Sequence, residues 1–230
     1  NYNIIADYCP LECEQCVPRL TSCEYYDGDT LYVSTVNSSG ILSDGSMDRP
    51  FISIQDALNS ARYGSILLVS DGVYFENIVW PNQDGIDLLA QNLGEVVIDG
   101  GQQDHVMLIG NQITNETLIS GITLQNGKGD SNSSGPCNTD GLGVCAGGLY
   151  VYGEASPVFD NLVVRNNTAT DLGGGIVVSD NANVVFNNLR VYDNHCENEG
   201  GGFAVSGDAI VELNNAIIWS NTANNYAPGI

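Results

Sequence analysis

The sequence between Gly147 and Ile230 repeats itself at an interval of 27 residues. Glycines mark the start of each copy, and apolar positions superpose between the copies. The glycines are Gly148, Gly175, Gly202 and Gly229, and the main apolar sets are Val151/Val178/Val205, Phe159/Phe186/Leu213, Leu162/Leu189/Ala216 and Val164/Val191/Ile218. A period of this length is typical of one supersecondary unit stacked on copies of itself. The repeat therefore predicts a solenoid.

Within each copy the apolar residues alternate with polar ones, which is the period of a β-strand. Each copy holds about three short strands separated by Gly, Asn, Asp and Ser turns. Three strands per turn, each lying on its copy in the next turn, make a parallel β-helix. Because one rung cannot bury its inward side chains alone, stacked rungs share a continuous core. We expect an all-β fold with about six rungs over residues 66–230, each about 4.8 Å from the next.

Asparagine repeats at two further positions, Asn161/Asn188/Asn215 and Asn167/Asn194/Asn221. Asparagine tolerates a left-handed backbone, and its amide bonds well to identical neighbours in a stack. We interpret both sets as ladders that shape the turns, and we assign them no chemistry.

Two runs resemble known repeats: Gly173-Gly174-Gly175-Ile176 and Gly200-Gly201-Gly202-Phe203, each after an Asn-containing turn. They are similar to right-handed parallel β-helix repeat proteins, specifically to polymorphic outer-membrane-protein-type repeats within the pectate-lyase-like superfold. The segment from Asp48 to Leu58, followed by Gly64–Val69, resembles the entry into such a helix. The resemblance covers roughly residues 30–230 and implies a right-handed fold. It leaves the function open, because this superfold hosts lyases, hydrolases, adhesins and structural fibres.

The organisation that we expect has two parts, a cysteine-rich segment at residues 1–29 and a β-helix domain at 30–230. Thr30 to Val36 has the composition of a strand. Residues 52–62 follow Pro50 and carry apolar side chains near helical spacing, which predicts a short helix that covers the open first rung. About 13 residues are inserted between copies, and they fall in a Gly/Ser/Asn loop at 128–145.

The chain contains seven cysteines, which favours an oxidising compartment. Cys9, Cys13, Cys16 and Cys23 are expected to form two disulfides of undefined connectivity, rather than a zinc site, whose cysteine pairs are usually separated by a longer loop. Cys137 and Cys145 would close the inserted loop as a local disulfide. Cys196 has three open alternatives: a free thiol, a pair between chains, or a bond to another of these cysteines.

Several features together favour a secreted or cell-surface glycoprotein. Four sequons predict N-linked glycans at Asn37, Asn115, Asn132 and Asn166. The formal net charge of −22 argues against nucleic acid and anionic membrane surfaces as partners. No apolar stretch is long enough to insert into a membrane. The sequence starts without methionine or signal peptide, so we expect a processed chain or part of a longer one.

No catalytic, cofactor-binding or metal-binding set is predicted from the sequence. Arg165 has Tyr192 and Trp219 as its copies in the repeat, which suggests a stacked guanidinium–aromatic ladder. Lys128 is the only lysine, and His105 and His195 lie on separate segments. Calcium could bind near Asp44, Asp48 or Asp130, although turn aspartates are common.

Three functions remain open at this stage. The first is a non-catalytic extracellular scaffold or filament subunit, because the last repeat stops without a predicted cap and an open rung favours contact with itself or a neighbouring protein. The second is a lyase or hydrolase acting on acidic polysaccharide, with Lys128, Arg165 and nearby acids as its candidates. The third is a carbohydrate-binding module that stacks sugars on the Tyr192/Trp219 face.

Overall fold

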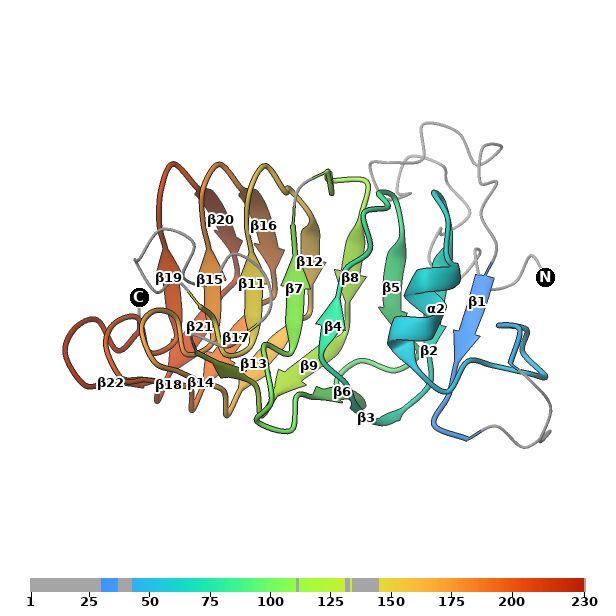
Figure 1. Cartoon of the computed structure of the whole chain (residues 1–230), viewed down its shortest axis with the longest axis horizontal. Coiled ribbons are helices and arrows are strands. Elements are labelled where there is room, and N and C mark those ends of the chain that lie inside the picture. Colours follow the sequence, from blue (N-terminus) through green and yellow to red (C-terminus); the bar gives the residue numbers. More distant parts are fainter. Residues whose placement is uncertain (1–29, 37–42, 111, 131–132, 134–144, 230) are drawn as a thin grey trace.

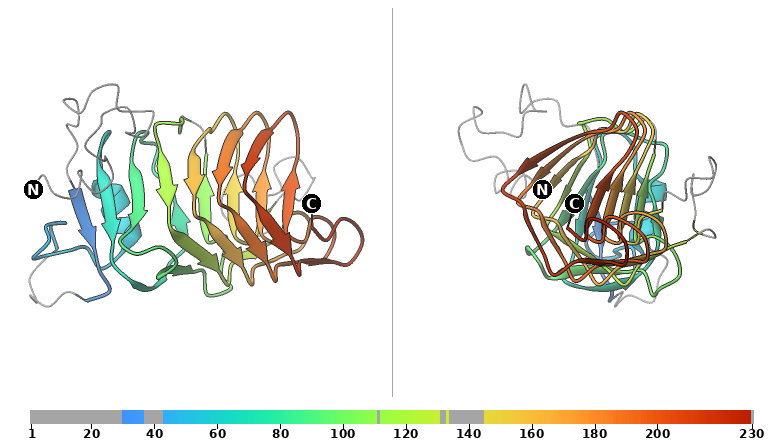
Figure 2. Two further views of the ribbon diagram at one scale, coloured as in Figure 1. Left: turned by 180° about the vertical axis from the view of Figure 1, so that it is seen from behind. Right: turned by 90° about the vertical axis from the view of Figure 1, so that its left-hand side faces the viewer.

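The chain folds as a right-handed parallel β-helix (Figure 1). The structure is a computed structural model, and it describes residues 30–36, 43–110, 112–130, 133 and 145–229. Strands stack along the long axis of the molecule, and the one described helix, α2 (Ile54–Ser60), lies near the N-terminal end. Seen end-on in Figure 2, the strands form walls around a single core.

The walls are four sheets, and every pair of neighbouring strands within them is parallel. The seven-stranded sheet contains, in spatial order, β1 (Thr30–Val33), β2 (Ile66–Val69), β5 (Asp87–Ala90), β8 (Leu118–Ser120), β12 (Val158–Asp160), β16 (Asn183–Asn187) and β20 (Ile210–Asn214). The six-stranded sheet contains β3 (Gly72–Phe75), β6 (Val96–Asp99), β9 (Ile122–Gln125), β13 (Val163–Arg165), β17 (Arg190–Tyr192) and β21 (Ile217–Trp219). The five-stranded sheet contains β4 (Ile78–Val79), β7 (Met107–Ile109), β11 (Leu149–Val151), β15 (Ile176–Val178) and β19 (Phe203–Val205). The four-stranded sheet contains β10 (Lys128–Gly129), β14 (Thr168–Ala169), β18 (His195–Cys196) and β22 (Thr222–Ala223).

The 27-residue register predicted from the sequence is confirmed in the core. Val151 pairs with Val178, which pairs with Val205, and Phe159, Phe186 and Leu213 pair in the same way. The Phe159 and Phe186 rings stack with centroids 4.9 Å apart. Val205 and Leu213 differ from the expectation of a buried column, because 45% and 37% of their surfaces are exposed. Both lie on strands at the edge of their sheets, where no further described strand covers them.

The two asparagine ladders play different roles. Asn161, Asn188 and Asn215 have φ angles of 50°, 55° and 61°, as predicted for left-handed turn residues. At the second turn the left-handed positions are instead Asn166, Asp193 and Ser220, one residue earlier than the predicted ladder. The residues of the second ladder, Asn167, Asn194 and Asn221, come one position later and point into the molecule. Their side chains there join neighbouring turns of the β-helix by hydrogen bonds.

Three of the four repeated glycines, Gly148, Gly175 and Gly202, are required because successive turns approach closely. A Cβ atom added to Gly148 would lie 2.6 Å from the carbonyl oxygen of Gly175, and one added to Gly175 would meet the carbonyl oxygen of Gly202. Any larger residue would push the turns apart. The strongest sequence marker of the repeat therefore has a steric origin.

The N-terminal end is covered by β1 and α2. β1 adds a strand to the seven-stranded sheet, so this sheet begins before residue 66. Ser53 caps the N-terminus of α2. The helix ends at Ser60, so it is shorter than the predicted 52–62. The Gln55 side chain both donates to the Val79 carbonyl oxygen (3.0 Å) and accepts from the Val79 N–H (2.8 Å). The Gln55 side chain thus satisfies backbone hydrogen-bonding groups at the free edge of β4, in agreement with the predicted capping role.

Several predicted features lie outside the described residues. These are the cysteine-rich segment 1–29 and most of the inserted loop 128–145. Lys128 and Gly129 form β10, so the irregular part of that loop starts later than predicted. Cys145 and Ala146 are buried at its other end.

Candidate functional site

Side chains on the outer surface of the six-stranded sheet form one continuous row along the helix axis. Strand register aligns six residues, which we call the outer row: Phe75, Asp99, Gln125, Arg165, Tyr192 and Trp219. Because side chains alternate along a strand, the residues before them point into the core. Ile98, Leu124, Val164 and Val191 are fully buried there. The core thus fixes the direction of every side chain in the row.

Hydrogen bonds connect four members of the outer row. Gln125 Nε2 donates to Asp99 Oδ2 (2.8 Å), and Gln125 Oε1 accepts from Arg165 Nε (3.1 Å). Arg165 Nη1 then donates to the Tyr192 hydroxyl (3.2 Å). The contact between Arg165 and Tyr192 is therefore a hydrogen bond to the hydroxyl, where the sequence had suggested a guanidinium stacked on the ring.

Asp99 lies at one end of these four hydrogen-bonded residues and is nearly buried, with 7% of its surface exposed. Burial raises its pKa, but hydrogen bonds from Gln125, from the Gly101 N–H and from Asn126 outweigh that effect and leave the pKa below its usual value. Asp99 is therefore an ionised hydrogen-bond acceptor at neutral pH.

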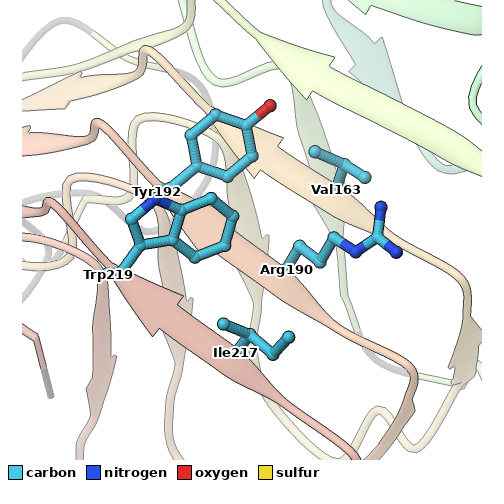
Figure 3. A pocket seen from close by; sticks show the side chains of 5 residues that line it. All are labelled: Val163, Arg190, Tyr192, Ile217 and Trp219. Atoms are coloured by element: carbon cyan, nitrogen blue, oxygen red, sulfur yellow. The ribbon is translucent and has the colours of Figure 1, made fainter.

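The other end of the row is aromatic. The rings of Tyr192 and Trp219 stack with centroids 4.2 Å apart and planes 18° from parallel. Beside them lies a groove of about 490 Å³, lined by Val163, Arg190, Tyr192, Ile217 and Trp219 (Figure 3). In Figure 3 the two rings overlap on one side of the groove, and the Arg190 side chain extends on the other. Trp219 keeps 41% of its surface exposed.

The cations on this face are not neutralised by carboxylates of the described residues, unlike Arg49 and Lys128. Arg49 pairs with Asp44, and Lys128 lies 2.7 Å from Asp130. Arg165 contacts only the neutral groups of the outer row, and the Arg190 guanidinium has no hydrogen-bond or ion-pair partner within the described part of the chain. The chain has 28 acidic and only 6 basic residues, so this absence of acidic partners sets the groove apart.

A second hollow of about 330 Å³ lies over the five-stranded sheet, next to Leu108 and Tyr152. Among the described residues, no charged side chain lines it. It offers fewer means of recognition than the groove.

The comparisons with known proteins concern the backbone. No protein-family model and no curated protein sequence matches the chain. Similar solved structures include the pectin methylesterase PemA from Erwinia chrysanthemi, with 16% identity over 71% of this chain and a TM-score of 0.42. A pectin methylesterase in complex with hexasaccharide VII matches with 14% identity over 80% of this chain and a TM-score of 0.42. This chain covers 55% and 66% of their lengths. They are similar in fold, and the site is argued from the residues of this chain alone.

The predicted glycosylation sites fall into two groups. Asn115 and Asn166 are exposed, as an attached glycan requires. Asn37 and Asn132 lie outside the described residues. Glycosylation at all four therefore stays a prediction.

The cysteines show a similar division. Cys9, Cys13, Cys16, Cys23 and Cys137 lie outside the described residues, so the predicted disulfides stay predictions, including the one between Cys137 and the buried Cys145. Cys196 is a buried free thiol in this structure, and its pairing between chains or with a cysteine outside the described residues is not tested. Burial raises the pKa of this thiol, which disfavours the reactive thiolate.

The residues proposed for enzymatic chemistry do not come together. Lys128 is paired with Asp130, and Arg165 belongs to the outer row. His105 is buried with Nδ1 2.6 Å from the Ala146 carbonyl oxygen, whereas His195 lies on β18 beside Thr222. Two of the three aspartates considered for calcium, Asp44 and Asp130, face basic partners. Among the described residues, no three His, Cys, Asp or Glu side chains gather as metal ligands, and no helix is long and apolar enough to span a membrane.

Sequence reasoning identified the Arg165–Tyr192–Trp219 part of the row but missed Asp99, Gln125 and Arg190. Gln125 could have been found, because the segment 120–126 matches 160–166 and places it under Arg165. Asp99 lies in a less regular turn, where no copy of the repeat marks its position. Arg190 could be recognised only once its lack of a partner was known.

Proposed function

We propose that this protein is a non-catalytic, extracellular glycan-binding β-helix. The glycan chain lies in the groove on the six-stranded sheet and carries an acidic group that meets Arg190. The observation that carries this proposal is the stacked pair of the half-buried Tyr192 and the exposed Trp219, next to a guanidinium without a partner among the described residues.

Aromatic side chains suit a carbohydrate ligand for a physical reason. The C–H faces of a sugar ring are apolar, and they pack on the flat surface of Trp or Tyr, whose polar atoms remain free for hydrogen bonds. Binding sites typically combine such apolar surface with a few convergent polar groups. The groove supplies Trp219 and Ile217 as surface, and the Tyr192 hydroxyl and Arg190 as polar groups.

Arg190 favours an acidic sugar because the guanidinium binds a carboxylate or sulfate through two parallel hydrogen bonds. The strongly negative net charge opposes an acidic ligand, but charges more than about 8 Å away are largely screened at physiological ionic strength. Arg190 lines the groove itself, so its charge lies within this distance of a bound ligand.

A binding role fits this face better than catalysis. Glycoside hydrolases generally use two carboxyl groups on either side of the scissile bond. The outer row contains a single carboxylate, Asp99, which is nearly buried and already accepts three hydrogen bonds. An extracellular location accords with the exposed sequons at Asn115 and Asn166 and with the acidic composition.

The test measures binding of the purified chain to neutral and acidic oligosaccharides by isothermal titration calorimetry. Trp219→Ala should weaken binding of the preferred glycan about tenfold or more, as expected for a central aromatic contact. Arg190→Gln should reduce the preference for acidic over neutral oligosaccharides.

Two variants serve as matched controls. Phe75→Ala removes an exposed aromatic side chain from the opposite end of the outer row, and Arg49→Gln removes an arginine remote from the groove. Both should bind as the original chain does. Binding to no oligosaccharide, or equal losses in Trp219→Ala and Phe75→Ala, would refute the proposed function.

A further inference from the structure

The hydrogen bonds of the outer row have fixed directions, because two of its members can act in only one way. The ionised Asp99 carboxylate only accepts, and the Arg165 guanidinium only donates. Gln125 must therefore turn its NH₂ group toward Asp99 and its oxygen toward Arg165, as observed. The Tyr192 oxygen must accept from Arg165, which leaves the hydroxyl proton of Tyr192 free to be donated elsewhere.

We propose that Asp99 is a positioning residue that, through Gln125 and Arg165, sets Tyr192 as a hydrogen-bond donor to the glycan in the groove. This inference rests on the proposed function and adds to it the polarity of one contact: the glycan presents an acceptor oxygen to Tyr192. Asp99 acts at a distance, since it lies on β6 and Tyr192 on β17, with β9 and β13 between them.

A backbone hydrogen bond makes the direction of the hydrogen bonds in the outer row depend on the charge of residue 99. Asp99 Oδ1 accepts from the Gly101 N–H (3.0 Å), a donor that cannot be reversed. In Asp99→Asn the single amide oxygen must stay with Gly101, so the new NH₂ group faces Gln125. Gln125 then rotates its amide and presents its NH₂ group to the Arg165 N–H. Two donors meet there, and Arg165 loses its position next to Tyr192.

The experiment compares three variants for binding of an acidic oligosaccharide that the original chain binds. Tyr192→Phe removes the donor and should weaken binding about five- to tenfold, the effect of one hydrogen bond. Asp99→Asn should weaken binding to a similar degree. The combination of both should bind no more weakly than Tyr192→Phe alone, because both changes remove the same contact.

Rescue by an exchange of groups separates positioning from general support of the fold. In the double variant Asp99→Asn/Gln125→Glu, the new amide at position 99 donates to the new carboxylate at position 125, and that carboxylate accepts from Arg165. The hydrogen bonds from residue 99 to Arg165 are restored with the same net charge once Asn126, which donates to the same Asp99 oxygen as Gln125, turns its amide oxygen toward the new NH₂ group. Binding should then recover to within about twofold of the original. Asp160→Asn is the control, since Asp160 also accepts from two amides, Asn161 and Asn188, but on another sheet. It should not alter binding.

A second readout needs no ligand. The stacked Tyr192–Trp219 pair should give a near-ultraviolet circular dichroism signal that Asp99→Asn reduces and the exchange variant restores. If no oligosaccharide binds, the proposed function fails, and this signal still decides the positioning role. An unchanged signal in Asp99→Asn, or an exchange variant that is folded but as impaired as Asp99→Asn, would overturn the inference.

Discussion

At the scale of single residues, Asp99 links the stability of the fold to pH. Burial raises its pKa, but the hydrogen bonds from Gln125, Gly101 and Asn126 outweigh burial and hold the pKa below the ordinary value of about 3.9. The folded state therefore binds a proton less readily than the unfolded state. The stabilisation is fully present above the unfolded pKa and is lost as pH falls through the folded pKa.

Asp99→Asn should lower the free energy of unfolding at pH 7 by about 1–3 kcal/mol, the range for hydrogen bonds to a buried charged group. Urea unfolding at several pH values provides the measurement. The difference between the original chain and Asp99→Asn should shrink as the pH is lowered from about 5 to 2. A difference that stays constant over this range would contradict the role assigned to the carboxylate.

The site residues differ in how far the sequence could reveal them. Tyr192 and Trp219 lie in the exact repeat, so their alignment with Arg165 followed from spacing alone. Asp99 lies where the turns vary in length, and only the register of β6 with β9 places it under Gln125. The lack of a partner for Arg190 within the described part of the chain depends on the three-dimensional structure, because the sequence contains many acids that could have approached it.

At the scale of structural elements, the buried asparagine ladder holds neighbouring turns together. Asn194 Oδ1 accepts from the N–H of Asn167 (3.0 Å), and Asn194 Nδ2 donates to the carbonyl oxygen of Val164 (3.0 Å). The same group donates to Asn221 Oδ1 (2.9 Å). Only 1% of Asn194 is exposed, so water cannot replace these bonds.

Asn194→Ala should therefore destabilise the fold by about 2–4 kcal/mol, because it leaves several buried polar groups without partners. The control is Asn214→Ala, which removes an exposed asparagine on β20 that belongs to neither ladder and should cost less than about 1 kcal/mol. Chemical unfolding measures both variants. Equal losses in the two variants would show that the burial of Asn194 does not account for its contribution to stability.

The elements themselves could largely be predicted from the sequence. The period of two within the repeat indicated the strands, and the left-handed Asn161, Asn188 and Asn215 followed from turn chemistry. The pairing of Gln55 with the edge of β4 could not be predicted, because it depends on how α2 docks against a strand 24 residues away. The added strand β1 was predicted as a strand, but its place in the seven-stranded sheet required the structure.

At the scale of the whole molecule, the β-helix supplies a rigid surface with a fixed spacing. Successive strands present side chains about 4.8 Å apart, so an elongated ligand along the axis meets the rows in sequence. On this face Arg190 places a guanidinium in the groove, next to Tyr192 and Trp219. The central claim is that a glycan occupies this face at Trp219.

The two tryptophans of the chain provide the most direct measurement of that claim. Trp80 is buried in the core, whereas Trp219 lines the groove, and each gives one indole N–H signal in a ¹H–¹⁵N NMR spectrum. Trp219→Phe assigns the two signals. Addition of the acidic oligosaccharide should shift the Trp219 signal in a saturable manner and leave the Trp80 signal in place. Binding that leaves the Trp219 signal unchanged would contradict the account.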